Sequence, residues 1–145
     1  MENAFGRVVS VLVLVVAVFI VPLRINYEKV NYIRTIAITS KTVELVDCVR
    51  NNGYLDKDMY DSFKRSLAQM DVICNIELEH KRCGFFDNND VWISNSTRDI
   101  EEAVYANGGY DFRIGDYFKI IVYAVKNNGR EVLSYYGGTI RNERT

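Results

Sequence analysis

The chain has 145 residues, enough for one folded domain and a short additional segment. Its 18 Lys and Arg residues nearly balance its 19 Asp and Glu residues, so no charge surplus favours nucleic-acid binding or an acidic disordered tail. Ten Tyr and a single Pro are typical of a compact domain that contains β-sheet, rather than of a linker-rich chain.

The segment from Val8 to Leu23 is apolar apart from Ser10 and carries no charge. As a helix it would extend roughly 24 Å, somewhat less than the ~30 Å hydrocarbon core of a bilayer. Arg7 and Arg24 flank it and can reach the polar interface. The sequence therefore predicts a single-pass membrane protein, with membrane lipid as a partner of this segment.

Two other interpretations of the apolar segment remain open. A secretory signal could be cleaved at Val15-x-Ala17, although apolar residues would then remain at the new N-terminus. A helix buried in a soluble core would also be apolar on every face. The orientation is likewise open, because the basic residues after the span (Arg24, Lys29 and Arg34) slightly favour a cytoplasmic C-terminal domain.

The helix is expected to continue beyond the membrane, from about residue 5 to residue 51, with a kink at Pro22. Asn51-Asn52-Gly53 supplies the stop, because Gly53 can adopt the left-handed conformation after a helix. We divide the chain into a leader and span (1–24), an amphipathic continuation (25–53) and a globular domain (54–145). The apolar stripe of the continuation comprises Ile25, Val30, Ile33, Ile36, Ala37, Ser40, Val43, Val46 and Val49.

The remaining residues predict an α+β domain whose mostly antiparallel sheet packs on the first helix. Two helices are expected, one over 57–69 capped by Asp56, and one starting at Ser96 or Thr97 and ending near Ala106. Alternating apolar residues predict a strand over 72–80, and the turn-forming residues of 83–95 predict a loop.

The C-terminal third predicts a β-hairpin. A short strand and turn are expected over 110–116, and strong strands over 117–126 and 131–140. Asn127-Asn128-Gly129 has the composition of a hairpin turn. Gly137-Gly138 predicts a bulge or a bend in the last strand.

No nucleophile or acid–base group has a recognisable partner, so the sequence predicts no catalytic residue, cofactor or small-molecule substrate. His80, the one histidine, ends a predicted strand and is interpreted as an exposed or edge residue. The three cysteines form no metal-binding pair; buried free thiols are expected, with a Cys74–Cys83 disulfide as the alternative. Residues 87–90 are rich in oxygen-bearing side chains, but a solvated turn is expected there rather than calcium, and no metal site is predicted.

Three aromatic residues, Phe85, Phe86 and Trp92, flank that turn. If they are exposed, they would form an apolar surface for a partner. The alternative is that they close the core beneath a long loop.

A short leader ending in Gly6, the apolar segment from Val8 and Pro22 within it resemble type IV pilins and pseudopilins. The chain is also similar to TadE-like single-span envelope proteins, in segments such as Gly115-Asp116-Tyr117-Phe118. Position 11 is Val, where pilins generally carry Glu. The resemblance implies an extracytoplasmic C-terminal domain, other copies or related subunits as partners, and an assembly segment that includes Gly6, Val8, Leu12, Val16, Phe19 and Pro22.

The resulting hypothesis is a non-enzymatic, pilin-like subunit of a pilus, secretion or conjugation apparatus. The alternative is a membrane-tethered module that recognises a protein or ligand through residues 83–95.

Overall fold

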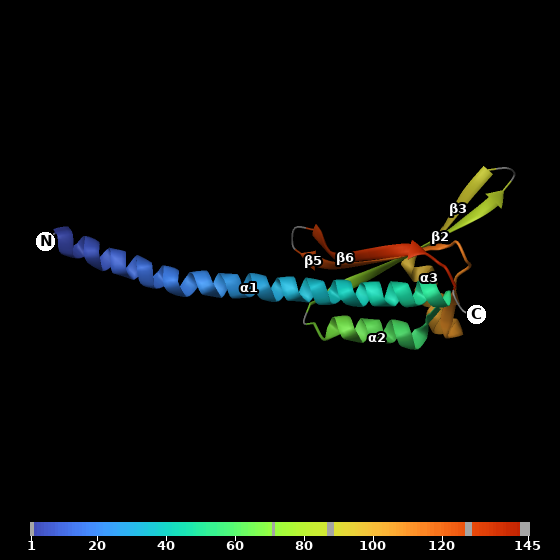
Figure 1. Ribbon diagram of the computed structural model, residues 1–145, viewed down its shortest axis with the longest axis horizontal. Coiled ribbons are helices and arrows are strands. Elements are labelled where there is room, and N and C mark those ends of the chain that lie inside the picture. The colour runs from blue at the N-terminus through green and yellow to red at the C-terminus, as the bar shows by residue number, and fades with distance from the viewer. Residues whose placement is uncertain (1, 71, 87–88, 127–128, 143–145) are drawn as a thin grey trace. The chain divides into compact units, whose positions relative to one another are not determined.

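Helix α1 extends without interruption from Glu2 to Asn52, so the expected single long helix is confirmed (Figure 1). The computed structural model describes residues 2–70, 72–86, 89–126 and 129–142; the side chains at 2–3, 83–86, 89–92 and 126 lie outside the description. The chain divides into two units, residues 1–34 and residues 35–145, with the boundary inside α1.

The end of α1 is fixed by Gly53. Its φ of 67° is left-handed, and its N–H donates to the carbonyl oxygen of Val49 at 2.8 Å. The carbonyl oxygen of Arg50 accepts hydrogen bonds from the backbone N–H groups of Arg141 and Asn142. The predicted helix stop is therefore confirmed, and the C-terminal segment supplies donors for a helix-end carbonyl that would otherwise lack a partner.

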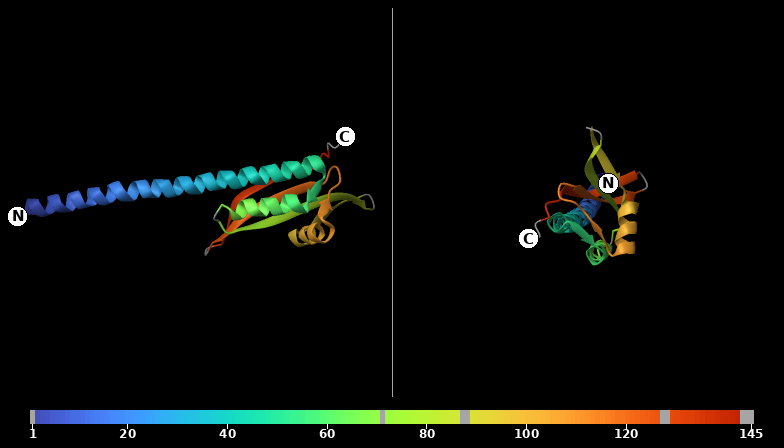
Figure 2. Two further views of the ribbon diagram at one scale, coloured as in Figure 1. Left: turned by 90° about the horizontal axis from the view of Figure 1, so that it is seen from below. Right: turned by 90° about the vertical axis from the view of Figure 1, so that its right-hand side faces the viewer.

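The second unit is α+β, with two antiparallel sheets (Figures 1 and 2). Four strands form one sheet in the order β3-β2-β5-β6, and β1 pairs with β4 in a small second sheet. The elements after α1 are β1 (Tyr54–Asp56), α2 (Lys57–Ala68), β2 (Cys74–Phe86), β3 (Asn89–Asn95), α3 (Thr97–Asn107), β4 (Gly109–Asp111), β5 (Tyr117–Lys126) and β6 (Gly129–Thr139).

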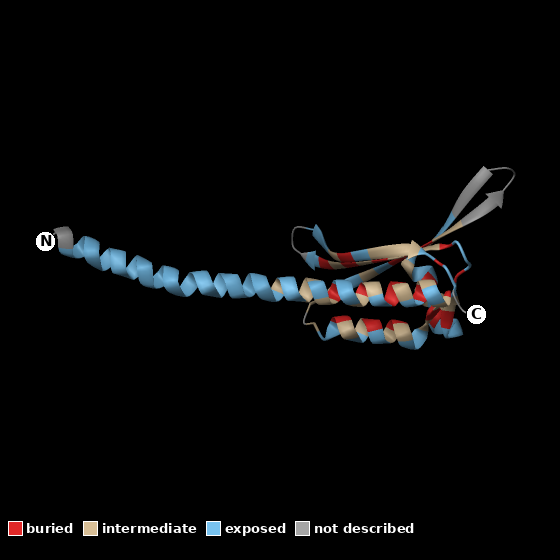
Figure 3. Cartoon of the chain, in the orientation of Figure 1, coloured by how far each residue is buried: buried red, intermediate tan, exposed pale blue. Residues whose placement is uncertain are grey.

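One face of the large sheet supplies the core together with all three helices, as the buried residues in Figure 3 show. Period-two alternation directs every second residue of β5 inward. None of the described residues on the opposite face is buried. The largest core residues include Ile38 and Val46 of α1, Tyr60 and Phe63 of α2, Ile100 of α3, Leu78 of β2, and Phe118, Ile120 and Val122 of β5.

The predicted apolar stripe on α1 is wrong in part. Ile33, Ile36 and Ser40 are exposed, whereas Ile38 and Thr42 are buried. Thr42 can be buried because its hydroxyl donates to the Ile38 carbonyl oxygen at 2.8 Å. The face of α1 that packs on the sheet comprises residues 38, 42, 45, 46 and 49. The predicted stripe, which was extended from residue 25 at helical spacing, includes only two of these positions, 46 and 49.

The predicted loop over 83–95 is also wrong. The backbone on either side of residues 87–88 forms two paired strands, with Phe86 opposite Asn89 and His80 opposite Asn95. Turn-forming residues gathered at the connection of a hairpin made the whole segment resemble a loop.

The bulge lies elsewhere than expected. The register of β5 with β6 shifts between Val122 and Tyr123, opposite Leu133, and not at Gly137-Gly138. Gly138 instead allows a close approach, because a Cβ there would lie 2.6 Å from Nε of Arg50.

Most other elements agree with their predicted bounds within two residues. α2 begins after Asp56 and buries Tyr60, Phe63 and Leu67. α3 begins after Ser96, whose backbone N–H and hydroxyl both donate to the Asp99 carboxylate. It ends at Asn107 and is followed by the left-handed Gly108.

Candidate functional site

The predicted assembly residues lie in the first part of α1. Every described residue from Ala4 to Val30 is exposed, including Gly6, Val8, Leu12, Val16, Phe19 and Pro22. By length and composition, α1 is a candidate membrane span, and none of its most apolar stretch is buried.

The predicted partner residues Phe85, Phe86 and Trp92 lie on the paired strands β2 and β3, but their side chains lie outside the description. β2 pairs with β5 only as far as Lys81. Beyond Lys81, β2 and β3 pair only with each other among the described strands, and this β2–β3 arm extends past the rest of the sheet (Figure 1).

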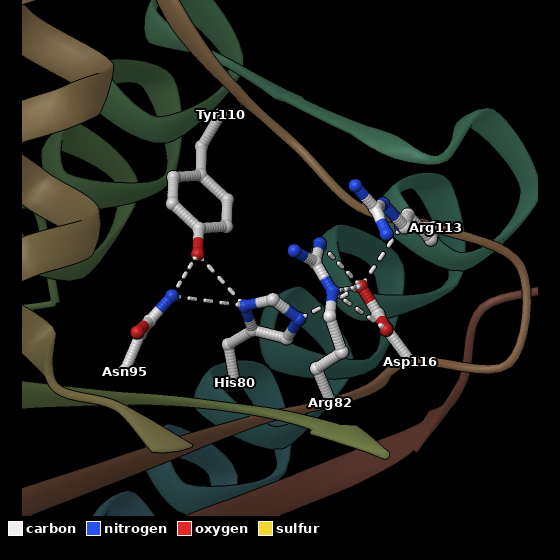
Figure 4. Close-up of polar contacts among 6 residues, drawn as sticks. All are labelled: His80, Arg82, Asn95, Tyr110, Arg113 and Asp116. Atoms are coloured by element: carbon white, nitrogen blue, oxygen red, sulfur yellow. Dashed lines mark hydrogen bonds and ion pairs between the residues drawn. The ribbon is translucent and has the colours of Figure 1, made fainter. Parts of the chain in front are cut away.

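A buried polar network that the sequence analysis missed holds the base of this arm (Figure 4). His80 was expected at an exposed strand end, but it lies inside β2 and is 1% exposed. Its Nε2 lies 2.9 Å from Oδ2 of Asp116, which is 3% exposed. The prediction failed because β2 continues six residues beyond His80, to Phe86, and pairs with strands on both sides.

Asp116 is held by donors from three directions. The Arg82 guanidinium donates through Nε and Nη2 to the carboxylate, with Nη2 2.9 Å from Oδ2. The backbone N–H of Arg113 donates to the same oxygen at 2.9 Å. Burial alone would raise the pKa of Asp116, but these hydrogen bonds and the one from His80 hold it below the usual value.

The protonation of His80 follows from its partners. Because an ionised Asp116 can only accept, Nε2 of His80 carries a proton and donates it to this carboxylate. Nδ1 then accepts from the hydroxyl of Tyr110 at 2.7 Å. Nδ2 of Asn95 donates to the Tyr110 oxygen in turn. Burial lowers the pKa of His80 despite the neighbouring Asp116, which favours this neutral form.

The network joins four parts of the fold. His80 and Arg82 belong to β2, Asn95 ends β3, Tyr110 lies in β4, and Asp116 lies in the turn before β5. Aromatic packing closes it from inside, with the His80 and Phe112 ring centroids 5.0 Å apart. Both ring nitrogens of His80 are hydrogen-bonded. The network therefore connects the base of the arm to β4 of the small sheet and to the turn before β5.

One signal in the sequence could have located this network. Cys74, Ile76 and Leu78 alternate along β2 on its inward face, and His80 continues the same alternation. A histidine on a buried face needs hydrogen-bond partners. Nothing local indicated Asp116 as that partner, because it lies 36 residues further along the chain.

Cysteines and possible metal ligands add no further site among the described residues. Cys48 is exposed, against the expectation of buried thiols, and Cys74 is half-buried; both are free. The alternative of a Cys74–Cys83 disulfide is wrong, because Cys74 is free and both residues lie on the one extended strand β2, nine positions apart and too far for a disulfide. The expected turn at residues 87–88 lies outside the described residues. The described part of the chain holds no cluster of three His, Cys, Asp or Glu residues that could bind a metal.

Comparison of the chain with protein-family models, with curated proteins and with solved structures found no match.

Proposed function

We propose that this chain is a membrane-anchored, non-enzymatic, pilin-like subunit of a pilus, secretion or conjugation apparatus. The observation that carries the proposal is the first part of α1. Residues 8–23 are uncharged, apolar on every face and exposed in the folded chain. Such a surface is stable in lipid or against neighbouring helices, and not in water.

The order of parts supports the pilin-like interpretation. One helix carries the apolar segment and then continues without interruption into the core of an α+β domain with an antiparallel sheet. Beyond the apolar segment, Ile25, Val30 and Ile33 are also exposed. They offer an apolar surface on which α1 helices of neighbouring copies can pack. In this proposal the globular domain is extracytoplasmic.

A membrane-retention experiment tests the anchor. The full chain should remain with membranes after washing at alkaline pH and should dissolve only in detergent. Leu12→Arg together with Val16→Arg should release it, because each buried charge costs about 2.5–3.5 kcal/mol at the middle of a span. The matched control is Ile114→Arg at an exposed position of the second unit. Unchanged retention of the double variant would refute the anchor.

The mature N-terminus tests processing. Mass spectrometry of the membrane-bound protein should find residues 8–23 still attached, with either the original terminus or a new one at Arg7. A mature chain that begins near Val18 would instead identify a cleaved secretory signal. That result would remove the assembly segment and refute the proposal.

The β2–β3 arm supports a second candidate function, a tethered module that binds a partner protein. A two-stranded ribbon is only marginally stable alone, yet here the His80 network fixes its base. Trp92→Ala should abolish in-cell cross-linking to that partner and leave membrane retention and self-association unchanged. Ile114→Ala is the exposed control. Equal cross-linking by both variants would refute this candidate.

A further inference from the structure

The hydrogen bonds around His80 form one chain with a single direction (Figure 4). Nδ2 of Asn95 donates to the Tyr110 oxygen, and the Tyr110 hydroxyl donates to Nδ1 of His80 at 2.7 Å. Nε2 of His80 donates in turn to Asp116 at 2.9 Å. Every donor in this chain meets an acceptor, and only the neutral ring that carries its proton on Nε2 permits that direction.

A proton on Nδ1 of His80 disturbs one end of the chain and spares the other. Nδ1 becomes a donor, so the Tyr110 oxygen would have to accept from both His80 and Asn95. The hydroxyl hydrogen of Tyr110 would then lack an acceptor, because His80 and Asn95 are its hydrogen-bond partners among the described residues. The bond from Nε2 to Asp116 is unaffected. Protonation therefore acts against the contact with Tyr110 alone.

A second positive charge at this place would also be poorly compensated. The Asp116 carboxylate already pairs with the Arg82 guanidinium, whose Nη2 lies 2.9 Å from Oδ2. His80 is 1% exposed, so its ring lies away from water. Burial and the charge of Arg82 lower the pKa of His80, against the effect of Asp116. With His80 protonated, these three groups carry one net positive charge.

The other elements around His80 offer it apolar rings or charges that are already engaged. Its ring packs against Phe112, and Phe118 of β5 and Gly138 of β6 lie at its level in the large sheet. The Arg113 side chain, in the turn before β5, is exposed. The charged side chains nearby are paired as follows: Arg50 of α1 with Asp47, Asp99 of α3 with Ser96, and Glu79 of β2 with Lys81 and Lys119.

The contact with Tyr110 joins the base of the β2–β3 arm to the small sheet. Asn95 ends β3 directly opposite His80, whereas Tyr110 lies in β4 opposite Leu55 of β1. β2 pairs with β5 through Lys81, and Tyr110 takes no part in that ladder. Loss of the Tyr110 contact therefore frees the base of the arm from the small sheet and leaves the large sheet paired.

We propose that His80 makes the attachment of the arm to the small sheet sensitive to pH, because a proton on Nδ1 separates His80 and Asn95 from Tyr110 while His80 stays bonded to Asp116. The proton comes from water and is taken up when the contact opens. An imidazole exposed by opening has the ordinary pKa of about 6.5, so the open arrangement gains up to about tenfold for each pH unit below that value. The inference concerns the second unit alone and does not rest on the membrane anchor.

Amide hydrogen exchange of the full chain in detergent tests the opening. Between about pH 7.5 and about pH 5.5, the protection factors of the β3 and β4 amides, at 93–95 and 109–111, should fall up to about tenfold. Those of β5 at 120–122 should stay constant, because β2 and β5 remain paired. An equal fall in β5 would show opening of the whole unit and overturn the proposal.

His80→Gln is the matched variant for this exchange experiment. Its amide side chain does not titrate, so the protection factors at 93–95 and 109–111 should lose their pH dependence over the same range. A His80→Gln chain that keeps the dependence of the original chain overturns the role of His80.

Titration of the imidazole by NMR tests the part played by Tyr110 without relying on His80 variants. His80 is the one histidine of the chain, so its ring signal is identified directly. Its titration midpoint should lie below about 6.5 in the original chain. Tyr110→Phe should raise that midpoint by about half a pH unit, since it removes a hydrogen bond made only to the neutral ring.

Tyr54→Phe, on the neighbouring strand β1, is the control for this titration and should leave the midpoint unchanged. A midpoint that stays or falls in Tyr110→Phe would show that protonated His80 keeps Tyr110 by donating to it, and would overturn the proposal. An original chain whose His80 titrates at or above about 6.5 would overturn it as well.

Discussion

The carboxylate of Asp116 and the imidazole of His80 lie 2.9 Å apart, with both side chains almost completely buried. Arg82 compensates the charge of Asp116, and Tyr110 occupies the second ring nitrogen of His80. Isolated burial of either group would be costly. Together they form a hydrogen-bonded set that connects strands distant in the sequence, and the loss of one member removes a hydrogen bond from each residue bonded to it.

Asp116→Asn should destabilise the second unit by about 3 kcal/mol, because it leaves the Arg82 charge without its partner and turns one acceptor into a donor facing His80. Urea unfolding of the detergent-solubilised chain, followed by circular dichroism, measures the change. Asp111→Asn, at an exposed position of β4, is the control and should be close to neutral. Equal effects of the two variants would contradict the role of the network.

The stability of the second unit should fall on mild acidification. Burial lowers the pKa of His80 in the folded state, so the neutral ring contributes its full stability above the unfolded pKa of about 6.5. That contribution is lost as the pH falls through the lower, folded pKa. The loss is measured by the thermal unfolding midpoint at a series of pH values from about 7.5 to about 4.5, a range that includes the ordinary pKa of histidine.

His80→Gln is the control for this pH dependence. It should be less stable than the original chain at neutral pH and should show a weaker dependence on pH over the same range. An original chain that gains stability on acidification would contradict a depressed pKa of His80, since the sign of the slope follows directly from the direction of the shift.

Gly53→Ala should destabilise the junction between α1 and β1 by about 1–2 kcal/mol, because Gly53 has a φ of 67° that costs an L side chain strain. A Cβ there would also lie 3.1 Å from Cγ of Asn142. The urea midpoint measures the loss, and Asn51→Ala on the exposed last turn of α1 is the control. A neutral Gly53→Ala would mean that the helix end rearranges without strain.

Tyr60→Phe should destabilise the contact between α2 and α3 by about 1.5 kcal/mol, since the fully buried Tyr60 donates its hydroxyl proton to the Glu101 carboxylate at 2.6 Å. Tyr105→Phe removes a similar hydrogen bond, to Asp61, at an exposed position and should cost less. Differential scanning calorimetry compares the two. A larger effect for Tyr105→Phe would contradict the importance of burial.

Much of the local structure could be predicted because its causes are local. The helix-ending Gly53, the capping pair Ser96 and Asp99, and the alternation along β2 each act within a few residues. The predictions failed where pairing partners decide the structure. Backbone pairing between β2 and β3 made strands of a segment rich in turn formers, and packing of Arg50 against Gly138 explains a glycine that had suggested a bulge.

The sequence by itself determined that residues 8–23 form an uncharged apolar segment and that an α+β domain follows, because hydrophobic periodicity and helix-stop signals act over short distances. Only the tertiary structure decided the strand order and the burial of His80 beside Asp116. These features depend on which distant segments lie side by side, and the burial that makes a polar side chain need a partner exists only after the chain has folded.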